Sequence, residues 1–447
     1  MKRKIFPLAV LLLLLAGSVY LNNLLPVITG YAAKNLASGI FVAGRTQESL
    51  ETEDLDFFPV NMVCNTVNRE KQEVTSRFLW RKAKAIRLKG YGCTLLKDFS
   101  EKEIRNRYYP EQAALPGKPD TVLWPFGELL PDSLPSGIDR NKLNRVTGQL
   151  MADTLPYRGT FALMVLYKGL PVAEAYRGDM SPTTRFLSWS MAKSVTSALI
   201  GIRVQEGKLD INKPLDLPGW QVDERRNINP GHLLHMNSGL SWDEDYGGLS
   251  DVTVMLYKAG DMGNYTARKP LETKPGTKWK YSSGTTNLAS MVLRRSFSSD
   301  RDYFDYPRKV LFNPLGMRSA VFELDASGTF AGSSYLYAGL RDYARFGLLY
   351  LNRGRWMGRQ LLQTEWIDYT LTPASGSEGR YGAFFWLNRS GTELPDAPAD
   401  TYLCKGHDGQ FIIIIPSREL VVVRMGYSRK SEFDANRMIR EILNCLE

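Results

Sequence analysis

The sequence predicts an α+β fold in which one antiparallel sheet is flanked by helices and joined to a mostly helical region. Strand patterns lie near both ends of the predicted domain, in "TFALMVLYKGLPVAEAYRG" (160–178) and "GQFIIIIPSRELVVVRMG" (409–426). Between them, residues 230–400 alternate helical patterns with loops rich in Gly, Pro and Ser. Strands grouped at the two ends, with helices between them, are typical of α+β domains.

The elements follow in chain order. The first segments, 39–45 and 83–96, read as strands in an N-terminal extension over residues 31–138, whose proline-rich end (110–138) reads as a linker or an ordered wrap. The main domain, 139–447, is expected to begin with an amphipathic helix and a hairpin and to end with a helix. Its predicted elements are helix 139–153, strands 161–167 and 172–176 around the Lys168-Gly169 turn, a helix from 190 to 205 stopped by Gly207, the strand pair around 416–419, and helix 432–446.

Composition excludes some classes of protein. The 447 residues are 43% hydrophobic and 23% charged, which is ordinary for a folded chain and does not indicate disorder. The formal net charge is +10. No long Lys/Arg block with interleaved aromatic residues accompanies it, so we expect no nucleic-acid partner. A basic protein surface that faces an anionic cell envelope explains the positive net charge equally well.

The N-terminus has the plan of an export signal. Met1 to Lys4 is basic, and Ile5 to Leu21 is almost wholly apolar. We interpret residues 1–30 as a signal peptide or a signal anchor; small residues at 16–18 and at 30–33 leave cleavage open. Uncleaved, residues 5–28 are long enough to span roughly 30 Å of hydrocarbon and to anchor the chain in the inner membrane. The basic end stays in the cytoplasm, so the rest is expected to be exported to the periplasm.

Export gives the four cysteines a possible structural role. Four cysteines allow three pairings. Local pairing of Cys64 with Cys93 and of Cys404 with Cys445 closes the shortest loops and is our expectation, with free buried thiols as the alternative. No Cys-x-x-Cys is present, so a zinc site is not indicated.

The stretch "SWSMAKSVTSALIG" (188–201) raises the central question of function. Ser190 and Lys193 are three residues apart at the start of a predicted helix and share one face of it. A serine hydroxyl is a weak nucleophile until a base takes its proton, and a desolvated lysine can be that base. The free N–H groups of a helix start can stabilise an oxyanion. The spacing alone is also expected about once by chance in a chain of this length.

The stretch resembles the nucleophile motif of the serine β-lactamase and penicillin-binding protein superfamily, in its class C β-lactamase-like branch. The resemblance covers roughly residues 140–447. It implies a β-lactamase/transpeptidase-like fold and a serine hydrolase that forms an acyl-enzyme on Ser190, with no metal and no organic cofactor. Members of this branch include esterases, D-aminopeptidases and 6-aminohexanoate-dimer hydrolases.

Two further motifs follow in order. "NPGHLLHMNSGLSWDEDY" (229–246) resembles a segment of this branch, and its Trp242 most resembles the 6-aminohexanoate-dimer hydrolase group. We interpret His232 and His235 as hydrogen-bonded structural residues and not as metal ligands. In "KYSSG", Tyr281 and Ser283 stand where class C enzymes have Tyr-x-Asn. A phenol beside a cationic lysine is expected to lose its proton more easily and to pass one to a leaving group.

The last motif is the triplet His407-Asp408-Gly409, which stands where the superfamily has Lys-Thr-Gly. Gly409 is expected to let substrate approach the backbone. The N–H of Gln410 is expected to hold the oxyanion together with that of Ser190. His407 is expected to donate a hydrogen bond to substrate or to Tyr281. The missing lysine argues against binding of a β-lactam carboxylate.

Other residues complete the expected pocket, whose walls include Tyr381 and Trp386. The sequence thus predicts an exported hydrolase of a small-molecule or peptide ester or amide. Two alternatives remain: a D-amino-acid peptidase or transpeptidase that acts on cell-wall peptides, and an inactive member that serves as a binding module. A Gly-x-Ser-x-Gly elbow, which an α/β-hydrolase needs, is missing from the sequence.

Overall fold

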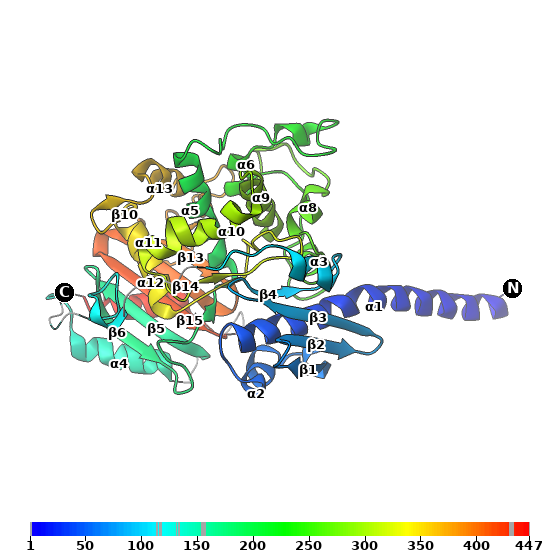
Figure 1. Ribbon diagram of the computed structural model, residues 1–447, viewed down its shortest axis with the longest axis horizontal. Coiled ribbons are helices and arrows are strands. Elements are labelled where there is room, and N and C mark those ends of the chain that lie inside the picture. Colours follow the sequence, from blue (N-terminus) through cyan, green and yellow to red (C-terminus); the bar gives the residue numbers. More distant parts are fainter. Residues whose placement is uncertain are drawn as a thin grey trace.

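A six-stranded antiparallel sheet forms the centre of the protein (Figure 1), which confirms the α+β prediction. The computed structural model describes residues 2–112, 115, 119–130, 132, 135–152, 158–428 and 433–446, and only the backbone of 2–11 and 13. The strand order is β12-β13-β14-β15-β5-β6. The bounds are β5 (Thr160–Tyr167), β6 (Leu170–Tyr176), β12 (Trp386–Leu387), β13 (Tyr402–Gly406), β14 (Gln410–Ile415) and β15 (Leu420–Gly426).

Both faces of this sheet are covered by helices. In β14, Ile412 and Ile414 belong to the core shared with α5 (Ala192–Gln205) and α12 (Leu340–Leu351), whereas Ile413 and Ile415 belong to the core under α4 (Arg140–Met151) and α14 (Ala435–Leu443). Successive side chains of a strand point to opposite faces, so burial of both faces explains the unbroken apolar runs. The predicted helices 139–153 and 432–446 match α4 and α14, although residues 153 and 432 lie outside the described residues.

Helices between the strands of the sheet form the second region, as the sequence predicts. Most of them share one hydrophobic core with the inner face of the sheet. The elements are β7 (Phe186–Leu187), α6 (Pro230–Leu234), α7 (Asp251–Lys258), α8 (Met262–Ala267), α9 (Ser283–Arg295), α10 (Asp300–Pro307), α11 (Asn313–Leu315), β8 (Val321–Phe322), β9 (Leu336–Ala338), β10 (Arg355–Trp356), β11 (Arg359–Gln360) and α13 (Thr364–Thr370).

The N-terminal part is a long helix laid across a small sheet. Helix α1 (Lys2–Phe41) packs on the sheet β1-β2-β3-β4 with its second half and extends beyond the body of the protein with its first half (Figure 1). The remaining elements are α2 (Gln47–Ser49), β1 (Cys64–Asn68), β2 (Glu73–Phe78), β3 (Arg81–Leu88), β4 (Gly92–Leu95) and α3 (Glu101–Asn106). Strands β3 and β4 confirm the strand prediction for 83–96.

The strand predicted for 39–45 is wrong, because α1 continues to Phe41. The apolar run at 40–43 is short, whereas a longer helical spacing dominates. Ala33, Leu36, Ala37 and Ile40 recur at intervals of three and four residues and are all buried in the N-terminal core. Burial of this stripe favours the helix over a short strand.

A buried ion pair joins α1 to the main domain. Lys34 on α1 donates to the carboxylate of Glu323, which follows β8, and also to the carbonyl of Cys93. Glu323 accepts two further bonds, from the Ser38 hydroxyl at 2.9 Å and from the Cys93 N–H at 2.6 Å. Both charged side chains are at most 3% exposed. Such a fully bonded pair is expensive to break on one side, so loss of either partner should weaken the junction between the extension and the main domain.

The expected disulfides are wrong, because all four cysteines are free. Cys64 lies on β1 and Cys93 on β4, at opposite edges of the four-stranded sheet, roughly 14 Å apart at the usual strand spacing. Cys404 faces the inner core and Cys445 the core under α14, so the central sheet separates them. A disulfide requires Cα atoms within about 7 Å.

The apolar N-terminus was expected to form a membrane segment. Among the residues whose side chains are described, no helix is long and apolar enough to cross a membrane. The proposed boundary at residue 30 falls inside α1.

Candidate active site

Ser190 lies in a tight turn at the start of α5. The turn is a 3₁₀ segment (Trp189–Met191), and Trp189 has a φ of +46°, which is uncommon for a residue with a side chain. Strained backbone of this kind is found at functional sites, where the surrounding structure holds it in place. Ser190 itself is half-buried and therefore accessible.

Lys193 lies one helical turn later and is bonded to Ser190. Its Nζ is 2.8 Å from Ser190 Oγ, 3.0 Å from Ser283 Oγ and 3.1 Å from the carbonyl oxygen of Ser333. Burial lowers the pKa of Lys193 to about 8, against the opposing charge of Glu244. Roughly a tenth of the amine is then neutral at pH 7 and able to accept a proton.

Glu244 is the residue that sequence reasoning missed. Its carboxylate accepts bonds from the Ser283 hydroxyl and, at 2.8 Å, from the Ser283 N–H, and it also accepts the indole N–H of Trp242. Burial raises the pKa of Glu244, and the Lys193 charge and the bonds from Ser283 oppose this rise. Ser283 thus links the lysine to a carboxylate. An acidic residue in a loop rich in Asp and Glu gives no signal of such a role before folding.

Tyr281 lies against the lysine and the nucleophile. The Lys193 Nζ is 4.9 Å from the centroid of its ring, and its hydroxyl shares a hydrogen bond with Ser190. Burial and the negative charge of Glu244 raise the pKa of Tyr281 well above its usual value. The expectation that the lysine would ease loss of the phenolic proton is therefore wrong. The phenol is protonated at neutral pH and acts as a hydrogen-bond donor or proton donor.

Aromatic rings surround this tyrosine. The ring centroid of Tyr281 is 5.3 Å from that of Trp386 and 5.8 Å from that of Tyr381. Trp386 is half-buried, whereas Tyr381 is fully buried. The two expected wall residues therefore hold the Tyr281 ring in place, and Tyr381 does so from inside the core.

The triplet His407-Asp408-Gly409 forms a turn between β13 and β14, beside the nucleophile. The His407 ring stacks on Tyr246 at 4.9 Å and packs edge-on against Trp189 at 5.4 Å. A Cβ built on Gly406, at the end of β13, would be 2.3 Å from the carbonyl oxygen of Ser188. This end of the sheet is therefore in direct contact with the turn that carries Ser190.

The backbone at Gly409 can accommodate only glycine without strain. Its φ is +81°, and a Cβ there would be 2.4 Å from Nη1 of Arg424, which donates to the Gly409 carbonyl oxygen at 2.6 Å. The next residue, Gln410, uses its side chain to bond both backbone groups of Gly426. The roles of the Gln410 N–H and of Gly409 toward substrate stay predictions.

The two other histidines make local hydrogen bonds. His232 Nδ1 accepts the N–H of Asn229 at 3.3 Å and so helps to cap α6. His235 Nδ1 lies 3.3 Å from the Gly231 carbonyl oxygen and 3.2 Å from the Tyr369 hydroxyl. These bonds are the ones expected of structural residues.

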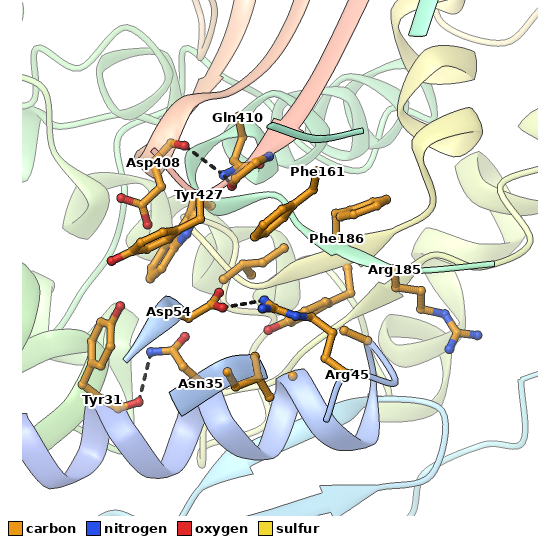
Figure 2. A pocket seen from close by; sticks show the side chains of 17 residues that line it. Tyr31, Asn35, Arg45, Asp54, Phe161, Arg185, Phe186, Asp408, Gln410 and Tyr427 are labelled. Carbon is orange, nitrogen blue, oxygen red and sulfur yellow. Dashed lines mark hydrogen bonds and ion pairs between the residues drawn. The ribbon is translucent and has the colours of Figure 1, made fainter. Parts of the chain in front are cut away.

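A small cavity lies between the N-terminal extension and the turn at Asp408 (Figure 2). It has a volume of about 50 Å³ and is lined by Asn35 of α1, by Asp54, and by Trp189 and Asp408 of the site. Burial and the charge of Asp54 raise the pKa of Asp408 to about 8. The N-terminal extension thus contributes the wall behind the turn that holds His407.

Comparison with known proteins identifies the family. The profile of the family described as Beta-lactamase matches residues 149–445, more than half of the chain. The chain belongs to the β-lactamase family. Membership of this family makes the protein a serine hydrolase and agrees with the sequence resemblance.

Similar proteins within the family are distant. The 6-aminohexanoate-dimer hydrolase of Paenarthrobacter ureafaciens is 24% identical over 294 residues, which cover 60% of this chain and 72% of that protein. A family VIII carboxylesterase matches with a TM-score of 0.53 at 15% identity, over 68% of this chain and 96% of its own. EstCE1, a hydrolase with promiscuous acyltransferase activity, matches with a TM-score of 0.55 at 14% identity, over 68% and 98%. The two solved structures establish a shared fold.

Proposed function

We propose that this β-lactamase-family protein hydrolyses an ester or an amide through an acyl-enzyme on Ser190. The observation that carries the proposal is the 2.8 Å contact between Lys193 Nζ and Ser190 Oγ, combined with a lysine pKa lowered to about 8. A nucleophile with a partly neutral base in hydrogen-bond contact is the arrangement that acyl transfer needs.

The first half of the reaction forms the acyl-enzyme. Ser190 Oγ attacks the substrate carbonyl carbon while its proton passes to Lys193. The backbone N–H groups of Ser190 and Gln410 receive the oxyanion. As the bond to the leaving group breaks, Tyr281 gives that group its proton and is reprotonated by Lys193.

The second half repeats these steps with water. Water attacks the acyl carbon and transfers its proton to the same lysine and tyrosine pair. Ser190 leaves and recovers a proton, which restores the starting state. In both halves, Lys193 carries a positive charge after it accepts a proton. The negative charge of Glu244, linked to it through Ser283, stabilises that charge.

Covalent labelling tests the proposal. A fluorophosphonate probe should label the folded protein at Ser190, and Ser190→Ala should abolish labelling without a change in the unfolding midpoint. Ser188→Ala is a matched control, because that hydroxyl donates to the backbone carbonyls of Trp189 and Ser334. An intact, folded protein that is never labelled would favour the binding-module alternative.

The substrate class follows from the same site. The 6-aminohexanoate-dimer hydrolase and carboxylesterase relatives support a linear amide or an ester. A panel of short nitrophenyl esters, ω-amino-acid dimers, D-alanyl peptides and a chromogenic β-lactam, run against Ser190→Ala as the blank, decides between them. Turnover of D-alanyl peptides alone would instead support the peptidase or transpeptidase alternative.

We also propose that the protein is exported and held at the membrane by its N-terminal segment. The basic start and the apolar run from Ile5 to Leu21 support this, together with exposure of Leu14 and Val19, which are 66% and 62% exposed on α1. Membrane fractionation, followed by protease treatment of intact spheroplasts, tests it. Recovery in the cytosolic fraction would refute it.

A further inference from the structure

Helix α1 changes its surroundings abruptly at Asn22 and Asn23. From Leu25 onward most of its side chains are buried, whereas those described before Asn22 are all exposed. Figure 1 shows this first half extending alone beyond the body of the protein. Among the side chains described there, the exposed large apolar ones are Leu12, Leu14, Leu15, Val19, Tyr20 and Leu21.

The tip of the β2–β3 hairpin lies at this exit point. Trp80 donates its indole N–H to the side-chain oxygen of Asn22 at 3.5 Å, and Arg81 donates to the same atom. Leu79 and Trp80 are nevertheless 64% and 59% exposed. Two large apolar side chains therefore project into solvent beside the apolar half of the helix. Exposed apolar surface of this kind marks an interaction site.

Three cations share this position. Arg81 lies at Asn22, and Lys258 of α7 donates to Asn23 at 2.7 Å. The pKa of Lys97 is lowered first by burial and then by the charges of Lys258 and Arg81. Asp98 is the carboxylate that faces Lys97, and it also accepts the Gly260 N–H at 2.7 Å. In the described part of the chain, none of the three cations forms an ion pair within 4 Å. Like charges left together repel, and an external anion would relieve this repulsion.

We propose that Leu79, Trp80, Arg81, Lys97 and Lys258 form a collar that rests on an anionic lipid bilayer where α1 enters it. Tryptophan prefers the interface between headgroups and hydrocarbon, and Lys and Arg bind anionic headgroups. The collar rests on the proposed membrane attachment and adds lipid selectivity and orientation to it.

The dimensions agree with this placement. The apolar run from Ile5 to Leu21 is about 25 Å long as a helix, close to the thickness of a hydrocarbon core. The basic residues 2–4 then lie at one headgroup layer and the collar at the other. Because α1 continues without a break into the protein, the collar and helix together fix the height and tilt of the body above the lipid.

The test uses the full-length protein in vesicles whose acyl chains are brominated, because bromine quenches tryptophan fluorescence on contact. Subtraction of the Trp80→Phe signal isolates Trp80 from the other tryptophans. One vesicle set contains phosphatidylcholine alone, and the other also contains phosphatidylglycerol. We expect Trp80 to be quenched, and more strongly in the anionic set.

Charge removal identifies the role of the cations. Arg81→Gln, Lys97→Gln and Lys258→Gln should each weaken collar binding about fivefold, and only in anionic vesicles. Arg355→Gln combined with Arg359→Gln is the matched control, because both side chains are exposed on β10 and β11, far from α1 (Figure 1).

The outcomes separate the two proposals. Protein that floats with vesicles while Trp80 stays unquenched overturns the collar and leaves the helical attachment standing. Quenching that is equal in both lipid sets and indifferent to the charge variants overturns the anionic selectivity. Protein that does not float with either set overturns the attachment and the collar together.

Discussion

Replacement of Glu244 by glutamine tests whether the missed carboxylate sets the basicity of Lys193. The Ser283 hydroxyl bridges the two groups through bonds of 3.0 and 2.5 Å, so their charges lie at most about 5.5 Å apart. At an effective dielectric constant of about 20, this separation corresponds to about 3 kcal/mol, or about two pKa units. The Glu244 charge raises the pKa of Lys193, so its removal lowers that pKa further below 8.

The assay is the pH dependence of kcat/KM on an activated ester. The base must be neutral, so activity in the wild type should rise through pH 8 and level off above it. In Glu244→Gln the rise in kcat/KM should move to lower pH by about one to two units. The plateau value of kcat/KM should also be lower, because a weaker base accepts the proton.

Matched variants make the result specific. Ser283→Ala removes the hydroxyl that links Lys193 to Glu244 and should change the plateau value of kcat/KM. Asp243→Asn, in the same loop, retains the Oδ1 that accepts the Asp245 N–H and should leave the profile unchanged. A rise that stays at pH 8 in Glu244→Gln, or that moves toward alkali, refutes the coupling.

Three further predictions follow. Tyr281→Phe should lower kcat about 10²- to 10⁴-fold with little change in KM, because a protonated phenol is the proton donor; equal kcat would remove it from the mechanism. Lys34→Ala leaves the buried Glu323 carboxylate without its cation and should cost about 3–5 kcal/mol of unfolding free energy in urea; a loss below about 1 kcal/mol would contradict the role given to this pair. Reductant should not change the melting temperature, and a thiol reagent should titrate all four cysteines after denaturation; fewer reactive thiols would indicate a disulfide.

Sequence reasoning recovered the features that depend on local pattern. The hairpin at Lys168-Gly169 and the β14–β15 pair are predictable because turn residues separate strongly apolar runs. Ser190, Lys193 and Tyr281 were found because their motifs occur in a recognisable order, and the fold brings all three together.

The features that were missed depend on tertiary contacts. Glu244 acquires its role only when its loop meets α9 at Ser283, over a sequence separation that no local pattern encodes. The cysteine pairing failed because short loops in sequence do not imply neighbouring strands: Cys64 and Cys93 lie at opposite edges of one sheet. The length of α1 was missed because burial of one helical stripe outweighed the short apolar run at its end.

The boundary in α1 at Asn22 has an evolutionary consequence. Before it, the side chains that the structure describes are exposed, so substitutions that keep the segment apolar should accumulate freely. After it, Tyr31 and Asn35 line the cavity shared with Asp408, and Lys34 is paired with Glu323. Homologues should therefore diverge sharply in sequence on one side of Asn22 and retain a common pattern on the other, within a single helix.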